Sequence, residues 1–164
     1  MFSAPHLEEA ARLLDAFRAR NLKLAIAESC TGGLVAGLLT EIAGSSEVVE
    51  RAFVTYSNAA KQECLAVPAD LLRQHGAVSE AVARAMAEGA LGHSRADVAV
   101  SVTGMAGPGG GTAAKPVGLV HLAAARRRHA TLHLECRFGD IGRHQVRLKS
   151  VAAALELLRQ ALEK

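Results

Sequence analysis

Residues 22–33 read LKLAIAESCTGG, an apolar run followed at once by polar residues and two glycines. The short apolar run over 22–27 is typical of a buried strand. The glycines permit a tight turn, and the spacing of apolar residues over 31–42 predicts a helix. Such a strand that turns directly into a helix is typical of α/β proteins. Its loop lies at the carboxyl end of the strand, where ligands gather in these sheets.

The rest of the chain continues this alternation. Apolar residues at helical spacing predict an amphipathic helix over residues 5–20. Further strands are predicted over 52–56, 97–103, 117–125 and 130–138. Further helices are predicted around Lys61, between Pro68 and Gly76, from Ser79 to about His93, and over Leu148–Leu162, where leucines and a valine recur every three or four residues. The last strand alternates apolar and polar residues, so one of its faces should be exposed to solvent. We therefore expect one domain, residues 1–164, with an α/β fold: a three-layer α/β/α sandwich over a mixed sheet of about five strands.

Composition excludes several classes of protein. Half of the 164 residues are hydrophobic, 21% are charged and 3% are aromatic, so the chain can bury a core but offers few rings on which bases could stack. A net charge of +3 is too small for a nucleic-acid footprint, and no apolar run is long enough to span a membrane. The scattered cysteines Cys30, Cys64 and Cys136 predict neither disulfides nor zinc, and we expect a cytoplasmic protein without a metal.

The loop after the first predicted strand carries Ser29. A serine at a strand-to-helix turn presents its hydroxyl beside helix N-terminal amides, which can bind an anion or the oxyanion of acyl transfer. Alternatively, Ser29 or Thr31 is simply the N-cap of the helix. The G-x-S-x-G pattern of a nucleophile elbow does not match, because Ala27 and Thr31 occupy its glycine positions.

A second loop, TYSNAAK over 55–61, brings together a phenol, an amide and an amine. A lysine in a semi-buried position loses its charge more readily, and a neutral lysine can deprotonate a hydroxyl. The alternative is a solvated helix lysine and a core tyrosine. The S-x-x-K pattern fails, because Ala60 stands where the lysine is needed.

A third loop, TGMAGPGGGT over 103–112, is rich in glycine. It is not a Walker motif, which needs lysine at Gly110, nor G-x-G-x-x-G, because Thr112 takes the last glycine position. Its backbone amides can nevertheless surround a small anion. The alternative is a mobile connector.

The sequence resembles the CinA C-terminal domain family over about residues 5–160. The resemblance rests on six motifs in a fixed order: AESCTGG, TYSNxxK, GAVS, TGxAGPxGG, KPVG and RxxVR. The stand-alone members of that family are nicotinamide-nucleotide amidohydrolases, and we expect this sequence to represent the stand-alone form, without the amino-terminal partner domain of full CinA proteins. The resemblance implies conversion of nicotinamide mononucleotide and water to nicotinic acid mononucleotide and ammonia, with no cofactor, by a homodimer. The alternative is a non-catalytic nucleotide-binding or regulatory module of the same type.

The resemblance also implies roles for individual residues. The nucleophilic serine falls on Ser29, the catalytic lysine on Lys61, and a tyrosine that orients one of them on Tyr56. Substrate-binding positions are expected at Cys30, Thr31, Gly32, Gly33, Asn58, Thr103, Gly104, Gly107, Gly110 and Arg143. Many relatives carry an acidic residue directly before that arginine, whereas here Gly142 stands there and Asp140 is the nearest substitute.

Three neighbouring features have competing interpretations. Cys30 is an alternative nucleophile, but a thiol usually recruits a positioned histidine and none lies nearby in the sequence. The run Arg126–His129 is either a solvated hairpin tip, which we favour, or a nucleic-acid contact. Glu28 either steers a cationic ring or forms a salt bridge.

Overall fold

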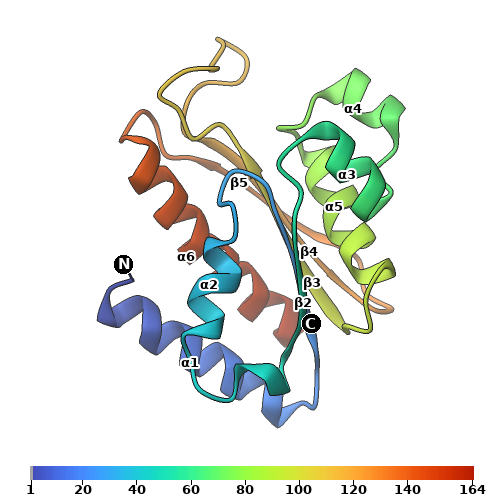
Figure 1. Ribbon diagram of the computed structural model, residues 1–164, viewed down its shortest axis with the longest axis vertical. Helices are drawn as coiled ribbons and strands as arrows, with labels where there is room; N and C mark the ends of the chain where they lie inside the picture. The colour runs from blue at the N-terminus through green and yellow to red at the C-terminus, as the bar shows by residue number, and fades with distance from the viewer. Residues whose placement is uncertain (1) are drawn as a thin grey trace.

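A computed structural model describes residues 2–164 and shows five strands and six α-helices in this range (Figure 1). The strands are β1 (Leu24–Glu28), β2 (Val49–Val54), β3 (Val98–Gly104), β4 (Leu119–Arg126) and β5 (Leu132–Arg137). The helices are α1 (Ala4–Ala19), α2 (Leu34–Thr40), α3 (Asn58–Leu65), α4 (Ala69–His75), α5 (Glu80–Gly92) and α6 (Arg143–Glu163), and a 3₁₀ turn, η1, spans Ser45–Glu47.

The strands form one mixed sheet in the order β2-β1-β3-β4-β5. The first three are parallel to one another, whereas β4 runs antiparallel to β3 and β5 antiparallel to β4. The carboxyl ends of β1, β2 and β3 therefore meet at one edge of the sheet. The loops that follow them are the three that the sequence singles out.

Helices cover both faces of the sheet. In Figure 1, α1, α2 and α6 lie on one side and α3, α4 and α5 on the other. Every residue of β1, and all of β3 except Gly104, is buried, as expected for central strands with helices on both faces. This arrangement confirms the three-layer α/β/α sandwich with a mixed five-stranded sheet.

Two local expectations need correction. The helix predicted over 31–42 begins only at Leu34, because Gly32 and Gly33 adopt the left-handed backbone conformation, with φ of 59° and 97°.

The polar face of β5 is also less exposed to solvent than expected. The His133 ring stacks on His121 of β4, with a nitrogen-to-nitrogen distance of 3.0 Å, and α5 packs over this part of the sheet.

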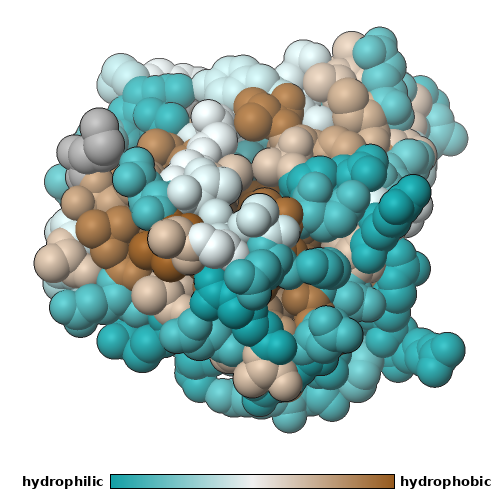
Figure 2. All heavy atoms as spheres, turned by 60° about the horizontal axis from the view of Figure 1, so that its bottom comes forward, coloured by the Kyte–Doolittle hydropathy of each residue, from teal (hydrophilic) through white to brown (hydrophobic). Residues whose placement is uncertain are grey.

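Hydrophilic side chains occupy much of the face shown in Figure 2, with apolar patches between them. Isolated apolar side chains are normal on a protein surface. Within the described residues, no helix has the length and apolar character needed to cross a membrane.

The packing of α3 against α5 depends on Gly89. A Cβ atom at this position would lie 2.1 Å from the backbone oxygen of Leu65. That distance is far below van der Waals contact, so the last turn of α3 can approach α5 only because residue 89 has no side chain. Because α3 carries Lys61, this contact also fixes where the lysine lies.

We expect Gly89→Ala to lower the free energy of unfolding by about 1–3 kcal/mol, because overpacking outweighs the better helix propensity of alanine. Gly92→Ala in the same helix is the control, since a Cβ there meets nothing within 4 Å. It should be neutral or slightly stabilising. Urea denaturation of both variants tests this, and equal stability of the two would contradict it.

Candidate active site

Ser29 and Lys61 lie together at the carboxyl edge of the sheet. The Nζ atom of Lys61 is 3.0 Å from Ser29 Oγ. It also donates to the backbone oxygen of Thr55 at 2.7 Å and lies 3.4 Å from that of Tyr56. Lys61 is 1% exposed, so the solvated helix lysine considered from the sequence is not what the structure shows.

Local structure places each member of the pair. Ser29 directly follows β1, and its N–H donates to the Val102 oxygen of β3 at 2.9 Å. Ser57 caps α3 by accepting from the N–H of Ala60 at 3.0 Å, and Lys61 follows in the first turn. Ser29 thus lies in the turn that directly follows a buried strand, and Lys61 lies in a capped helix.

The surroundings of Lys61 make its neutral form easier to reach. Burial lowers its pKa from the ordinary lysine value, because desolvation penalises the charged form. A neutral amine has two N–H bonds and one lone pair. Two carbonyl oxygens are available for the N–H bonds, which leaves the lone pair for the hydroxyl proton of Ser29. The site therefore contains an alcohol beside an amine that, in its neutral form, can accept the hydroxyl proton.

Glu28 caps helix α2. Its carboxylate is fully buried and accepts hydrogen bonds from the N–H groups of Gly33, Val35 and Ala36 at 3.0–3.1 Å. A carboxylate is favoured at this end of a helix, where backbone N–H groups carry a partial positive charge. Both readings of Glu28 from the sequence, ring steering and a salt bridge, are therefore replaced by capping. The expected use of the α2 amides for an oxyanion is wrong for these three N–H groups.

Tyr56 and Arg143 form a second pair at the mouth of the site. The side chain of Tyr56 is exposed, and its hydroxyl accepts from Arg143 Nη2 at 2.8 Å. Arg143 Nη1 donates to the oxygen of Gly107 at 2.9 Å. Tyr56 is thus not a core tyrosine, and its phenol hydrogen-bonds with Arg143 instead of orienting Lys61 or Ser29. Nor does Asp140 pair with Arg143, whose partners are Tyr56 and Gly107.

These groups surround a cavity of about 230 Å³. Of the residues expected from the sequence, it is lined by Ser29, Cys30, Tyr56, Lys61, Thr103, Gly104, Gly107 and Arg143. Residues not expected there are Ala77, Val78, Met105, Ala106 and Gly109. Ala77 and Val78 belong to the GAVS motif, and the Thr103 hydroxyl ties this segment to β3 by donating to the Ala77 oxygen at 2.8 Å.

Five residues expected to bind substrate lie outside this cavity: Thr31, Gly32, Gly33, Asn58 and Gly110. Gly33 is the N-cap of α2, and the N–H of Gly32 donates to Ser29 O at 3.0 Å. Thr31 is fully buried, whereas Asn58 and Gly110 are exposed. Gly32 and Gly33 therefore shape the turn that presents Ser29, instead of contacting a ligand in the cavity.

Cys30 is poorly suited to be the nucleophile. Burial raises the pKa of its thiol to about 12, and its side chain packs in the apolar core on the α2 and α6 side of the sheet. A thiol that remains protonated at neutral pH is a weak nucleophile.

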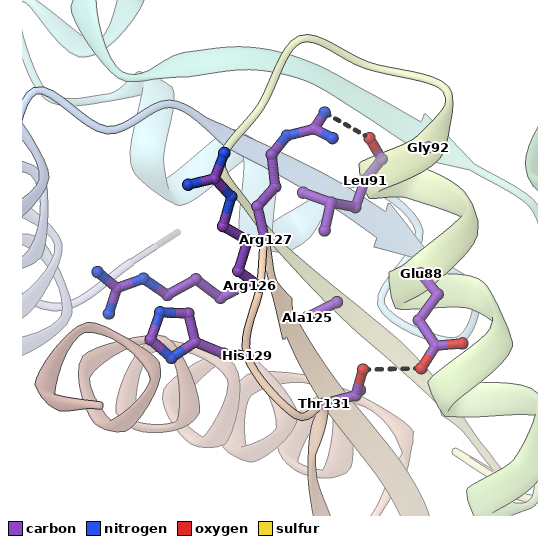
Figure 3. A pocket seen from close by; sticks show the side chains of 9 residues that line it. Glu88, Leu91, Gly92, Ala125, Arg126, Arg127, His129 and Thr131 are labelled. Carbon is purple, nitrogen blue, oxygen red and sulfur yellow. Dashed lines mark hydrogen bonds between the residues drawn. The ribbon is translucent and has the colours of Figure 1, made fainter.

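A larger cavity, of about 630 Å³, lies elsewhere, beside the β4–β5 hairpin (Figure 3). Two of its arginines cap helices: Arg127 donates to the backbone oxygens of Leu91, Ser94 and Ala96 around the end of α5, and Arg126 to that of Ala161 in α6. Arg127, Arg128 and His129 are exposed in the turn between β4 and β5, which agrees with the solvated hairpin tip that the sequence favours. Arg126 and Arg127 in addition hold helix ends against the sheet. Within residues 2–164, no group of three or more His, Cys, Asp or Glu side chains is arranged to hold a metal ion.

The fold and the pocket define an α/β/α domain with a Ser–Lys pair at the carboxyl ends of its parallel strands. The CinA C-terminal domain pattern matches residues 7–162, and the chain belongs to this family.

Its relatives carry the same family name. It is 51% identical to a "CinA-like protein" of Synechococcus sp. (strain RCC307), over 98% of this chain and 39% of that protein. A "CinA-like protein" of Mycobacterium sp. (strain JLS) is 54% identical over 85% of this chain and 33% of that protein. The chain thus spans between a third and two fifths of the length of these two relatives.

Solved structures show the same fold over nearly their whole length. The competence/damage inducible protein CihA from Agrobacterium tumefaciens is 55% identical, with a TM-score of 0.96 and coverage of 100% of this chain and 99% of that one. The competence damage-inducible protein A (ComA) from Klebsiella pneumoniae subsp. pneumoniae MGH 78578 is 37% identical, with a TM-score of 0.91 and coverage of 96% and 97%.

The capping role of Glu28 predicts a large loss of stability in Glu28→Gln. The amide leaves buried N–H groups without a charged acceptor and points its own donors at them, which should cost about 3 kcal/mol in the free energy of unfolding. Glu41→Gln, at the exposed end of α2, is the control and should change it by less than about 0.5 kcal/mol. Similar urea midpoints for the two variants would refute the capping interpretation.

Proposed function

We propose that this protein is an amidohydrolase that converts nicotinamide mononucleotide and water to nicotinic acid mononucleotide and ammonia through a seryl acyl-enzyme. The observation that carries the proposal is the 3.0 Å contact between Ser29 Oγ and the buried Nζ of Lys61. A domain that only binds nucleotides has no need of a desolvated base beside an alcohol. Membership of the CinA family supports the same class of ligand.

In the acylation step, the neutral amine of Lys61 removes the hydroxyl proton of Ser29 while Oγ attacks the carboxamide carbon. The tetrahedral intermediate collapses as the C–N bond breaks. Lys61, now protonated, delivers that proton to the leaving nitrogen, which departs as ammonia. Lys61 is neutral again at the end of this step.

In the second step, water attacks the ester carbonyl and Lys61 accepts a proton from it. The ester bond to Oγ then breaks, and the lysine returns the proton to Ser29. The carboxylate product is released and the enzyme is regenerated. The carbonyl oxygens of Thr55 and Tyr56 keep Nζ in place through both proton transfers.

Charge at the mouth of the cavity fits a phosphate-bearing substrate. The two hydrogen-bond partners of Arg143 are neutral groups, so its positive charge is not compensated by a carboxylate. A guanidinium with donors to spare is well suited to bind a phosphate oxygen. At the inner end, a cationic pyridinium ring would lower the pKa of Lys61 further, which favours the base form.

Ammonia release from nicotinamide mononucleotide is expected in the wild type and should fall at least about 1,000-fold in Ser29→Ala. Ser46→Ala is the control and should keep full activity, because this exposed serine lies in η1, before the start of β2, and does not line the cavity. Ammonia is measured by a coupled assay and the acid product by chromatography. Full activity in Ser29→Ala would remove the serine mechanism. A wild type that binds the nucleotide without releasing ammonia would point to the non-catalytic module.

The rate should rise with pH, because only the neutral form of Lys61 can act as the base. Since burial lowers the pKa of this lysine, the midpoint of the rise in kcat/KM should lie below the ordinary lysine pKa. Lys61→Arg should abolish activity across the range, because a guanidinium does not deprotonate in proteins. A profile without this rise, or with its midpoint at the ordinary lysine value, would contradict the assignment.

A further inference from the structure

Arg147 fastens the nucleophile loop from outside the cavity. It lies one helical turn after Arg143 on α6 and is not among the residues that line the cavity. Its Nε donates to the backbone oxygen of Cys30 at 3.1 Å, and its Nη2 donates to that of Thr31 at 2.8 Å. Within residues 2–164, these are the partners its guanidinium has, and neither is a carboxylate.

The carbonyls that Arg147 holds control the direction of N–H groups. In a planar trans peptide, C=O and N–H point in opposite directions, so fixing the Cys30 oxygen also fixes the N–H of Thr31. The Ser29 oxygen is held in the same way by the N–H of Gly32, at 3.0 Å, which fixes the N–H of Cys30. In the described part of the chain, neither of these two N–H groups donates to a protein acceptor.

These two N–H groups directly follow the nucleophile in the sequence. The residue after a nucleophilic serine supplies an oxyanion donor in other serine hydrolases, because its amide lies beside the atom under attack. The N–H groups of Gly33, Val35 and Ala36, further along the turn, are already taken by Glu28. Of the two remaining residues, Cys30 lines the cavity and Thr31 does not, so the donor left for an oxyanion on this loop is the N–H of Cys30.

We infer that Arg147 is a positioning residue for the N–H of Cys30. By holding the Thr31 oxygen it fixes the N–H of Gly32, which in turn holds the Ser29 oxygen. The N–H of Cys30 is thereby kept aimed at the oxygen of the tetrahedral intermediate. For its catalytic consequence this inference rests on the proposed amidohydrolase function. It assigns Arg147 a different task from Arg143, which faces the cavity itself.

Arg147→Met should lower kcat about 100-fold, the typical effect of losing one oxyanion donor, and leave KM within about 3-fold of the wild type. Arg147→Lys keeps a cation and one set of donors, so it should recover part of the loss. Methylguanidine added to Arg147→Ala should restore activity in a concentration-dependent way. The midpoint of the pH profile should not move, because Lys61 is untouched.

The matched control is Arg159→Met on the same helix, since Arg159 pairs with Glu156 and Glu163 at the surface. It should have wild-type kinetics. If Arg147→Met does not fold, the Lys variant and the rescue experiment carry the test. A wild-type kcat in Arg147→Met overturns the inference, as does a shifted pH midpoint or a loss confined to KM.

A second measurement separates this inference from the proposed substrate. An alkyl fluorophosphonate reacts with an activated serine: Oγ bonds to phosphorus, fluoride leaves, and the hydroxyl proton passes to Lys61. The phosphoryl oxygen then occupies the oxyanion position. Intact-mass analysis should show labelling of the wild type, none of Ser29→Ala, and labelling slowed at least 10-fold in Arg147→Met. If nicotinamide mononucleotide is not hydrolysed but this pattern holds, the proposed function fails and the role of Arg147 stands. Equal labelling rates overturn it.

Discussion

The buried amine of Lys61 is the constraint on which the rest of the site depends. Removing an amine from water is costly unless its hydrogen-bonding groups find partners, and here the partners are two backbone oxygens and the hydroxyl of Ser29. Each partner requires a feature of the fold. The carbonyls need the turn after β2 to close over Nζ, and the hydroxyl needs the sharp exit from β1. The approach of α3 to α5 needs a glycine at position 89.

Helix α6 joins the three loops that follow the parallel strands. Arg143 reaches the β2 loop through Tyr56 and the β3 loop through Gly107, and Arg147 reaches the β1 loop through two carbonyls. Three loops that are separate in the sequence, around residues 30, 56 and 107, are therefore held by two side chains one turn apart. An α-helix is a stiff element, so the relative positions of the loops follow from where its first turns dock.

Much of this could be predicted from sequence patterns, because buried strands and glycine turns have local signatures. These located the three loops, and the order of the strands then brought Ser29 and Lys61 together. The capping role of Glu28 could not be predicted. It depends on the backbone conformation of the turn between β1 and α2, which brings the carboxylate to the N–H groups of the helix, and no sequence pattern specifies that conformation. The contacts of Ala77, Val78 and Arg147 could not be predicted for a related reason, although these residues lie within the GAVS and RxxVR motifs. Such contacts depend on which distant segments of the chain pack together.

The capping of α2 by Glu28 also decides which charge is left facing the cavity. The N–H groups at the start of α2 are occupied by the Glu28 carboxylate, and Glu28 is not among the residues that line the cavity. Arg143 does line it, and neither of its hydrogen-bond partners is a carboxylate. An anionic group that approaches this edge of the sheet is therefore drawn to Arg143 and not to the end of α2.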